Sequence, residues 1–142
     1  MNKIKFEKSN ELKIYTSFNF DLSQNILSSK YDFIDEVYYN CEFNYIDLSL
    51  STFHHTVFYN CVFKNCKFKH TEIENCLFFN SIFYDCNFMS SKIRYTYFIE
   101  NDFKQTDFKD SKIRFSRLMK NKISDTIFNQ MVKNNGFLMF DL

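Results

Sequence analysis

Five cysteines and three histidines are the residues of this 142-residue chain that could carry metal or nucleophile chemistry. Thiols and imidazoles bind zinc, and a thiol or hydroxyl beside an imidazole can act as a nucleophile. No two cysteines have the two-residue spacing of a zinc-binding pair, and the lone glycine, Gly136, cannot form a phosphate-binding loop. We expect no catalytic residues, no metal site and no cofactor. The cysteines are Cys41, Cys61, Cys66, Cys76 and Cys86.

A five-residue period of apolar side chains positions these residues. Every fifth residue from Phe33 to Phe128 is apolar, 20 of 20, although only 45% of the chain is hydrophobic. The period fits neither an α-helix nor a strand, but it suits a chain that turns a corner every five residues and completes a square coil in twenty. The central residue of each side then points inward. The expected core contains Phe43, Phe58, Phe63, Phe68, Phe78, Phe83, Phe88, Phe98, Phe103 and Phe108.

A column of small residues lies two positions before the apolar one. From Cys41 to Thr126 it holds Cys, Ser or Thr at 15 of 18 places, and Ile46, Asn101 and Asn121 are the exceptions. All five cysteines fall in this column, so packing explains their positions. A disulfide remains an alternative for Cys41 with Cys61 and for Cys66 with Cys86, which should stack about 4.8 Å apart, although parallel Cβ directions suit a disulfide poorly.

The repeat resembles the pentapeptide-repeat family, whose units read small-x-(Leu or Phe)-x-x. Three such units are Cys61-Val-Phe-Lys-Asn, Cys66-Lys-Phe-Lys-His and Cys76-Leu-Phe-Phe-Asn. The resemblance implies an all-β fold, a right-handed quadrilateral β-helix of about five coils with N- and C-terminal caps. It also offers an alternative function, because some family members protect DNA gyrase from quinolones through an acidic, DNA-like surface.

The two ends depart from the repeat and are expected to cap it. We assign 1–30 to an N-terminal cap with a degenerate first coil, 31–130 to the β-helix and 131–142 to a C-terminal cap. In the first segment Phe18 is in frame but Lys8, Lys13 and Ser23 are not apolar, which indicates an insertion before Phe33. This segment has an apolar surface of its own, formed by Ile4, Phe6, Leu12, Ile14 and Phe20.

The C-terminal segment should form a short amphipathic helix and a lid over the last coil. Ile127, Phe128, Met131 and Val132 have helical spacing, and Ser124 or Asp125 could cap the start of the helix.

Outward residues can be sorted by side, because positions twenty apart lie above one another. One side is apolar at nine of ten outward places, the exception being Arg117. An apolar strip on a protein surface indicates a contact surface, so we expect self-association, cover by a terminal segment or a different partner. The nine residues are Val37, Tyr39, Val57, Tyr59, Leu77, Phe79, Tyr97, Ile99 and Met119.

A second side carries charged residues in register. Glu72 and Glu74 should pair with Lys92 and Arg94, each pair contributing at most about 1 kcal/mol. Lys112 and Arg114 then stack beside like charges, with Arg117, Lys120 and Lys122 nearby. The group of Lys92, Arg94, Lys112 and Arg114 is therefore a candidate site for an anion or an acidic partner, beside the alternative of a solvated ion-pair surface.

The composition of the chain disfavours several classes of function. A net charge of +1 argues against nucleic-acid binding over the whole surface. The chain shows no leader and no run of 18 apolar residues, so we expect a cytoplasmic protein outside the membrane. His54, His55 and His70 should be solvated. The sequence favours a non-enzymatic scaffold or interaction module with an unknown protein partner, which includes a homodimer, while its mixed charges disfavour gyrase protection.

Overall fold

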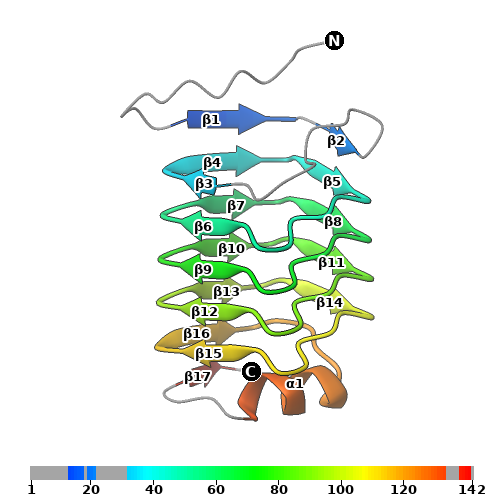
Figure 1. The fold of residues 1–142 in the computed structure, drawn as a ribbon, viewed down its shortest axis with the longest axis vertical. Coiled ribbons are helices and arrows are strands. Elements are labelled where there is room, and N and C mark those ends of the chain that lie inside the picture. The colour runs from blue at the N-terminus through cyan, green and yellow to red at the C-terminus, as the bar shows by residue number, and fades with distance from the viewer. Residues whose placement is uncertain (1–12, 18, 22–31, 134–137, 142) are drawn as a thin grey trace.

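Short strands and sharp corners alternate along the chain in the computed structural model. The structure describes residues 13–17, 19–21, 32–133 and 138–141. The strands form three parallel sheets that run the length of a β-helix of about five coils (Figure 1). The fourth side is held by isolated bridges that join Asp47, Lys67, Asn87 and Asp107 in turn. The predicted all-β, four-sided architecture is confirmed.

Strands at the same place in successive coils share a sheet, and we name the sheets A, B and C. Sheet A contains β1 (Lys13–Thr16), β4 (Glu36–Tyr39), β7 (Val57–Tyr59), β10 (Leu77–Phe79), β13 (Tyr97–Ile99), β16 (Ser116–Met119) and β17 (Leu138–Asp141). Sheet B contains β2 (Asn19–Asp21), β5 (Glu42–Asn44), β8 (Val62–Lys64), β11 (Ile82–Tyr84) and β14 (Asp102–Lys104). Sheet C contains β3 (Asp32–Ile34), β6 (Thr52–His54), β9 (Glu72–Glu74), β12 (Lys92–Arg94) and β15 (Lys112–Arg114).

The corners are made by residues in the left-handed backbone region. Every fifth residue from Asp35 to Lys120 has a positive φ, between 48° and 65°. Ten of these eighteen corner residues are Asn, Asp or His, the non-glycine types that tolerate this region best. The chain can therefore turn at each corner without glycine.

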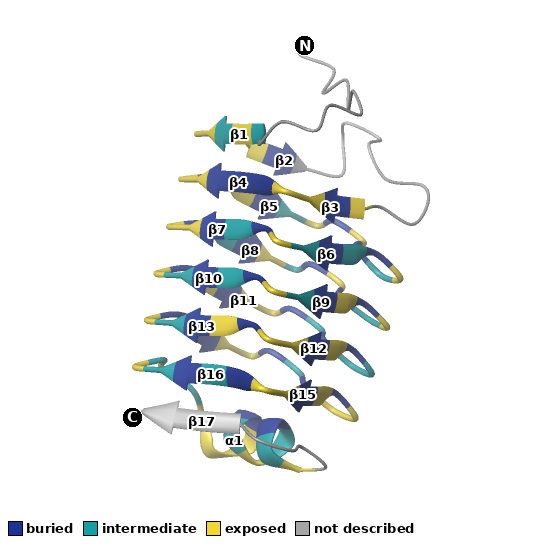
Figure 2. Cartoon of the chain, turned by 90° about the vertical axis from the view of Figure 1, so that its left-hand side faces the viewer, coloured by how far each residue is buried: buried dark blue, intermediate teal, exposed yellow. Residues whose placement is uncertain are grey.

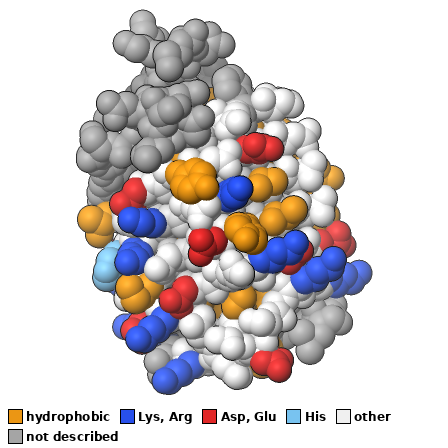
Figure 3. All heavy atoms as spheres, turned by 90° about the vertical axis from the view of Figure 1, so that its right-hand side faces the viewer, with side chains coloured by type: hydrophobic (Ala, Val, Ile, Leu, Met, Phe, Trp, Pro, Cys, Tyr) orange, Lys and Arg blue, Asp and Glu red, His pale blue; other side chains and the backbone are white. Residues whose placement is uncertain are grey.

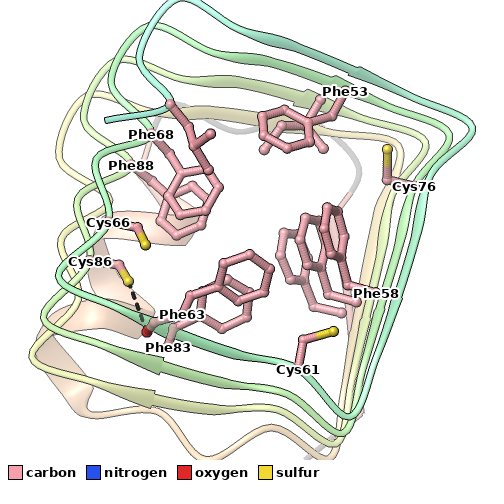
Figure 4. Packing of buried hydrophobic residues seen from close by; sticks show 14 of the residues in the cluster. Phe53, Phe58, Cys61, Phe63, Cys66, Phe68, Cys76, Phe83, Cys86 and Phe88 are labelled. Carbon is pink, nitrogen blue, oxygen red and sulfur yellow. Dashed lines mark hydrogen bonds between the residues drawn. The ribbon is translucent and has the colours of Figure 1, made fainter. Parts of the chain in front are cut away.

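The apolar column fills the interior as predicted. All ten phenylalanines of the expected core are at most 4% exposed. Their rings stack from coil to coil, as for Phe58 on Phe78, with centroids 4.9 Å apart, and Phe68 on Phe88, 4.3 Å apart (Figure 4). Parallel β pairing fixes this spacing, so one large ring per side fills the tube.

The first coil follows a different register. β1 and β2 pair with β4 and β5 at an offset of 23 residues instead of 20, as an insertion before Phe33 would require. Tyr15 and Phe20 therefore occupy the inward places, while Phe18 lies outside the described residues. Phe20 is buried and stacks on Phe43, so its assignment to a separate apolar surface was wrong.

The C-terminal end closes the tube with a helix and a strand. α1 (Asp125–Val132) begins after Ser124, whose hydroxyl accepts a hydrogen bond from the Ile127 N–H, so the predicted cap is confirmed. Its start at Asp125 lies before the boundary at residue 130, and Phe128, counted in the apolar column, is half-buried in this helix. The apolar residues that α1 buries are Ile127 and Met131.

Gln130 makes hydrogen bonds that a further coil would otherwise make on the fourth side. Its side chain accepts a hydrogen bond from the Phe108 N–H at 2.9 Å and donates to Asp107 at 3.0 Å. An unpaired N–H at the end of the tube would be costly, so Gln130 closes the fourth side while β17 extends sheet A beside β16.

Candidate functional site

The cysteines act as structural hydrogen-bonding groups. The thiols of Cys61, Cys66 and Cys86 contact the carbonyl oxygens of Tyr38, Phe43 and Phe63 at 3.2–3.4 Å, and Figure 4 shows these thiols near the corners of the tube. Thr56 and Thr106 donate to the equivalent carbonyls. All five cysteines are buried and none forms a disulfide, so the disulfide alternative is not adopted.

The surroundings of the Cys76 and Cys86 thiols raise the pKa of both groups. Desolvation raises the pKa of Cys76 to about 12, and the contact with Cys66, followed by burial, raises the pKa of Cys86 further. A thiol acts as nucleophile or metal ligand only when it is deprotonated. At neutral pH Cys76 and Cys86 therefore remain protonated packing groups, whereas the hydrogen bond with Cys86 lowers the pKa of Cys66.

Sequence reasoning missed that the small column also accepts hydrogen bonds. The N–H groups of Cys61, Cys76 and Thr96 donate to the hydroxyls of Ser81, Thr96 and Ser116 in the next coil. Asn101 and Asn121, which looked like exceptions, do the same with a longer side chain. The residues of this column thus fill the corner and accept hydrogen bonds from its backbone N–H groups.

The three histidines lie at the surface of the described part of the molecule. His54 and His55 stack on each other with centroids 4.1 Å apart, and His55 lies 3.4 Å from Asp35 on an exposed corner. Within the described ranges, no group of three His, Cys, Asp or Glu side chains could hold a metal ion.

The predicted apolar face is the outer surface of five strands of sheet A, from β4 to β16. Tyr39, Tyr59 and Tyr97 are 39–47% exposed, whereas Val37 is buried below Ile14 of β1, its partner in register. The other residues of the face are half-buried, and Figure 2 shows this surface as a stack of strands with buried centres and more exposed ends.

Aromatic contacts make the apolar face continuous. The ring of Tyr59 stacks on Phe79 with centroids 5.2 Å apart and contacts Tyr39 at 5.6 Å. At the lower end the Arg117 guanidinium lies over the Tyr97 ring, 5.8 Å from its centroid. Prearranged aromatic side chains lose little conformational freedom on binding, which favours a contact role.

The predicted basic patch lies on the outer surface of β12 and β15 in sheet C. Lys92 and Arg94 are in register with Lys112 and Arg114. Arg94 forms the expected ion pair with Glu74, at 3.5 Å, whereas Lys92 lies opposite Glu72 without an ion pair in the described part of the chain. Both sides of an exposed ion pair are solvated, so it adds little stability.

An exposed aromatic pair joins the patch to the apolar face, and sequence reasoning missed it. Tyr95 and Phe115 occupy the same corner in successive coils, each with a φ of 51°. Their rings stack with centroids 5.3 Å apart, and each residue is about half exposed. A bulky residue with positive φ is uncommon. The five-residue spacing that places them at corners was visible in the sequence.

A different side of the molecule carries mixed charges. Figure 3 shows Lys and Arg side chains interspersed with Asp and Glu and with single apolar groups. This face is not continuously acidic, so it lacks the surface that a DNA-like rod would need. No helix in the described residues is long and apolar enough to cross a membrane.

Comparisons with known proteins give distant structural likenesses only. No sequence model of a known family matches the chain, and no curated protein matches it significantly. A trypsin-treated variant of QnrB1, a plasmid-mediated fluoroquinolone resistance protein, is 11% identical over 88% of this chain and 72% of its own, with a TM-score of 0.33. The pentapeptide repeat protein Rfr23 from the cyanobacterium Cyanothece 51142 is 10% identical over 92% and 82%, with a TM-score of 0.23. At these values the likeness carries no argument about function.

Proposed function

Because the chain consists of pentapeptide repeats that coil into a four-sided β-helix, we propose that it is a non-enzymatic protein-interaction module that binds through its apolar face. The observation that supports this proposal is the continuous row of apolar side chains across β4, β7, β10, β13 and β16, with three tyrosines 39–47% exposed. Contiguous apolar surface of this kind is typical of contact sites.

The rigid scaffold supports the same proposal. Each strand of the face is paired on both sides within sheet A, in register. The outward side chains are therefore held at a constant spacing of about 4.8 Å along the rod. A partner would meet a preorganised surface and would lose little affinity to ordering of this protein.

The proposal is tested by comparing two double substitutions on neighbouring sides of the rod. Tyr59→Glu with Phe79→Glu places charges in the apolar face, whereas Ile82→Glu with Tyr84→Glu places them on sheet B, where both residues are 39% exposed. In a pull-down from native lysate, we expect the tagged wild-type protein and the sheet B variant to capture a binding partner, which includes a second copy of the chain. We expect the apolar-face variant to capture none. Equal retention by both variants would contradict the proposal.

A further inference from the structure

The distribution of charge along the rod points to the occupant of the apolar face and to its orientation. The three coils of residues 32–91 contain three Lys or Arg and eight Asp or Glu, whereas residues 92–122 contain nine Lys or Arg and four Asp or Glu. The overall net charge of +1 hides this difference. The first three of these coils are therefore acidic, and the coil and a half that follow are basic.

We propose that the apolar face binds a second copy of this chain in an antiparallel arrangement, with a two-fold axis that crosses β10. This inference rests on the proposed function, since it names the partner of the same face. Two faces can pack with closed two-fold symmetry in two ways, with the rods antiparallel or parallel. The charged residues that flank the face distinguish these two ways.

The antiparallel arrangement places opposite charges together at both ends of the face. Each flank then meets the same flank of the partner, with the coil of β4 opposite the coil of β16. On one flank Asp35 lies opposite Phe115, between Arg114 and Arg117. On the other flank, Lys120 and Lys122 face Glu42. Complementary flanks of this kind fix the orientation of a complex and speed its formation.

The parallel arrangement places like charges together at the same ends. Each flank would then meet the opposite flank of the same coil, so Arg114 would face Lys120 in the coil of β16 and Asp35 would approach Glu42 in the coil of β4. The parallel arrangement gains one attraction, between Arg94 and Glu100, and avoids the approach of Glu74 to its own copy at the antiparallel axis, where each Glu74 is paired with Arg94 of its own chain. Like-charge contacts at both ends outweigh these gains and select against parallel pairing.

Apolar contacts also match in the antiparallel arrangement. Leu77 and Phe79 lie at the two-fold axis and meet their own copies, while Tyr59 lies opposite Ile99 and Tyr39 opposite Met119. The face is about 24 Å long, from five strands about 4.8 Å apart. With strands of three to four residues, about 10 Å wide, the strip covers less than the roughly 800 Å² that each partner buries in a standard interface, so the charged flanks must contribute to the contact.

Single surface cysteines provide a direct test, because the five native cysteines are buried. Tyr39→Cys and Met119→Cys are prepared separately and treated with a short bismaleimide, alone and as a mixture, with wild type as the control. The antiparallel arrangement brings Tyr39 to the partner's Met119 and keeps the two copies of Tyr39 four coils, about 19 Å, apart. We expect covalent dimers in the mixture and at most trace amounts with either variant alone.

A charge exchange tests the flanks independently of cross-linking. Arg114→Glu and Asp35→Lys should each weaken dimer formation in sedimentation equilibrium several-fold, and the double variant should recover it. Added salt should weaken the wild-type dimer, because exposed charges are screened.

The outcomes separate this inference from the proposed function. Cross-linking of Tyr39→Cys alone would show parallel pairing and overturn the inference. A wild-type protein that stays monomeric would overturn it as well, whether a terminal segment or a different protein covers the face. The proposed function would then stand if the apolar-face variant still loses a different partner that the sheet B variant retains.

Discussion

The middle of the tube and its first coil share one backbone geometry but are filled with different chemistry. Around Phe78 the interior holds phenyl rings and small groups that bond from coil to coil. In the first coil Tyr15 stacks on Tyr38 with centroids 4.8 Å apart. Glu36 occupies the place of a small residue there, and its carboxylate accepts a hydrogen bond from the Tyr38 hydroxyl.

The comparison shows what the repeat requires at each inward place. An inward side chain must fill the available volume and its polar atoms must be paired. In the middle, pairing comes from the backbone of the neighbouring coil, so short side chains suffice. In the first coil a long carboxyl side chain is accommodated because the Tyr38 ring carries a donor of its own. The two regions should therefore respond differently to substitution.

The largest difference should come from removing a ring in the middle of the stack. Phe78→Ala should lower the free energy of unfolding by roughly 3 to 5 kcal/mol, because the rigid neighbouring coils cannot collapse into the cavity. Phe20→Ala is the matched substitution in the first coil, where the ring stacks on Phe43 and is 7% exposed, against 0% for Phe78. Urea titration should give a smaller loss for Phe20→Ala, and equal losses would remove the distinction between the two regions.

Removal of a polar side chain from the column of small residues should have the next largest effect on stability. Asn101 accepts a hydrogen bond from the Ser81 N–H at 2.9 Å and donates to the Phe78 carbonyl at 2.8 Å. Asn101→Ala leaves both buried groups without this partner and should cost about 1 to 3 kcal/mol in urea titration. Asn101→Ser should cost less, because the hydroxyls of Ser81 and Ser116 accept the equivalent N–H bond at other coils. If the alanine variant were as stable as wild type, the column would serve packing alone.

The sequence predicted the regular coils because one physical cause sets their period. A square tube needs a large inward group on every side, and that requirement appears directly as phenylalanine at every fifth place. It also predicted the helix after Ser124, since the cap and the apolar spacing are local. The apolar face and the basic patch followed from the same register, which places Tyr59 beside Phe79 and Lys92 beside Lys112.

What the sequence did not predict depends on contacts between distant segments. The insertion between β2 and β3 shifts the register, so Tyr15 and Phe20 could not be assigned to inward places from a fixed period. The role of Gln130 depends on where α1 packs, which no local pattern specifies. The Asn101 bonds were missed because the column was interpreted by size alone, and the charge difference between 32–91 and 92–122 was hidden by the net charge.

The C-terminal end can be compared with the middle through Gln130. Gln130→Ala removes the side chain that pairs with the Phe108 N–H, a group that the next coil would pair in the middle of the tube. We expect a loss of about 1 kcal/mol in urea titration, since water can replace part of the bond at this end. Asn129→Ala, on an exposed part of the same helix, is the control. A loss of stability as large as that of Asn101→Ala would show that water reaches the C-terminal end of the tube no better than the middle.

The smallest effect should come from the first coil and should depend on pH. Burial raises the pKa of Glu36 above its ordinary value near 4.5, although the bond from Tyr38 and the charge of Lys13 oppose the shift. A carboxyl group with a raised pKa in the folded state contributes its full stability below pH 4.5, and this contribution is lost as the pH rises through the folded pKa. Glu36→Gln keeps a hydrogen-bond acceptor for Tyr38 and removes the buried charge. Its melting temperature should therefore exceed that of wild type slightly at pH 7 and match it near pH 4, whereas a variant less stable at pH 7 would mean that the charged carboxylate is required in the first coil.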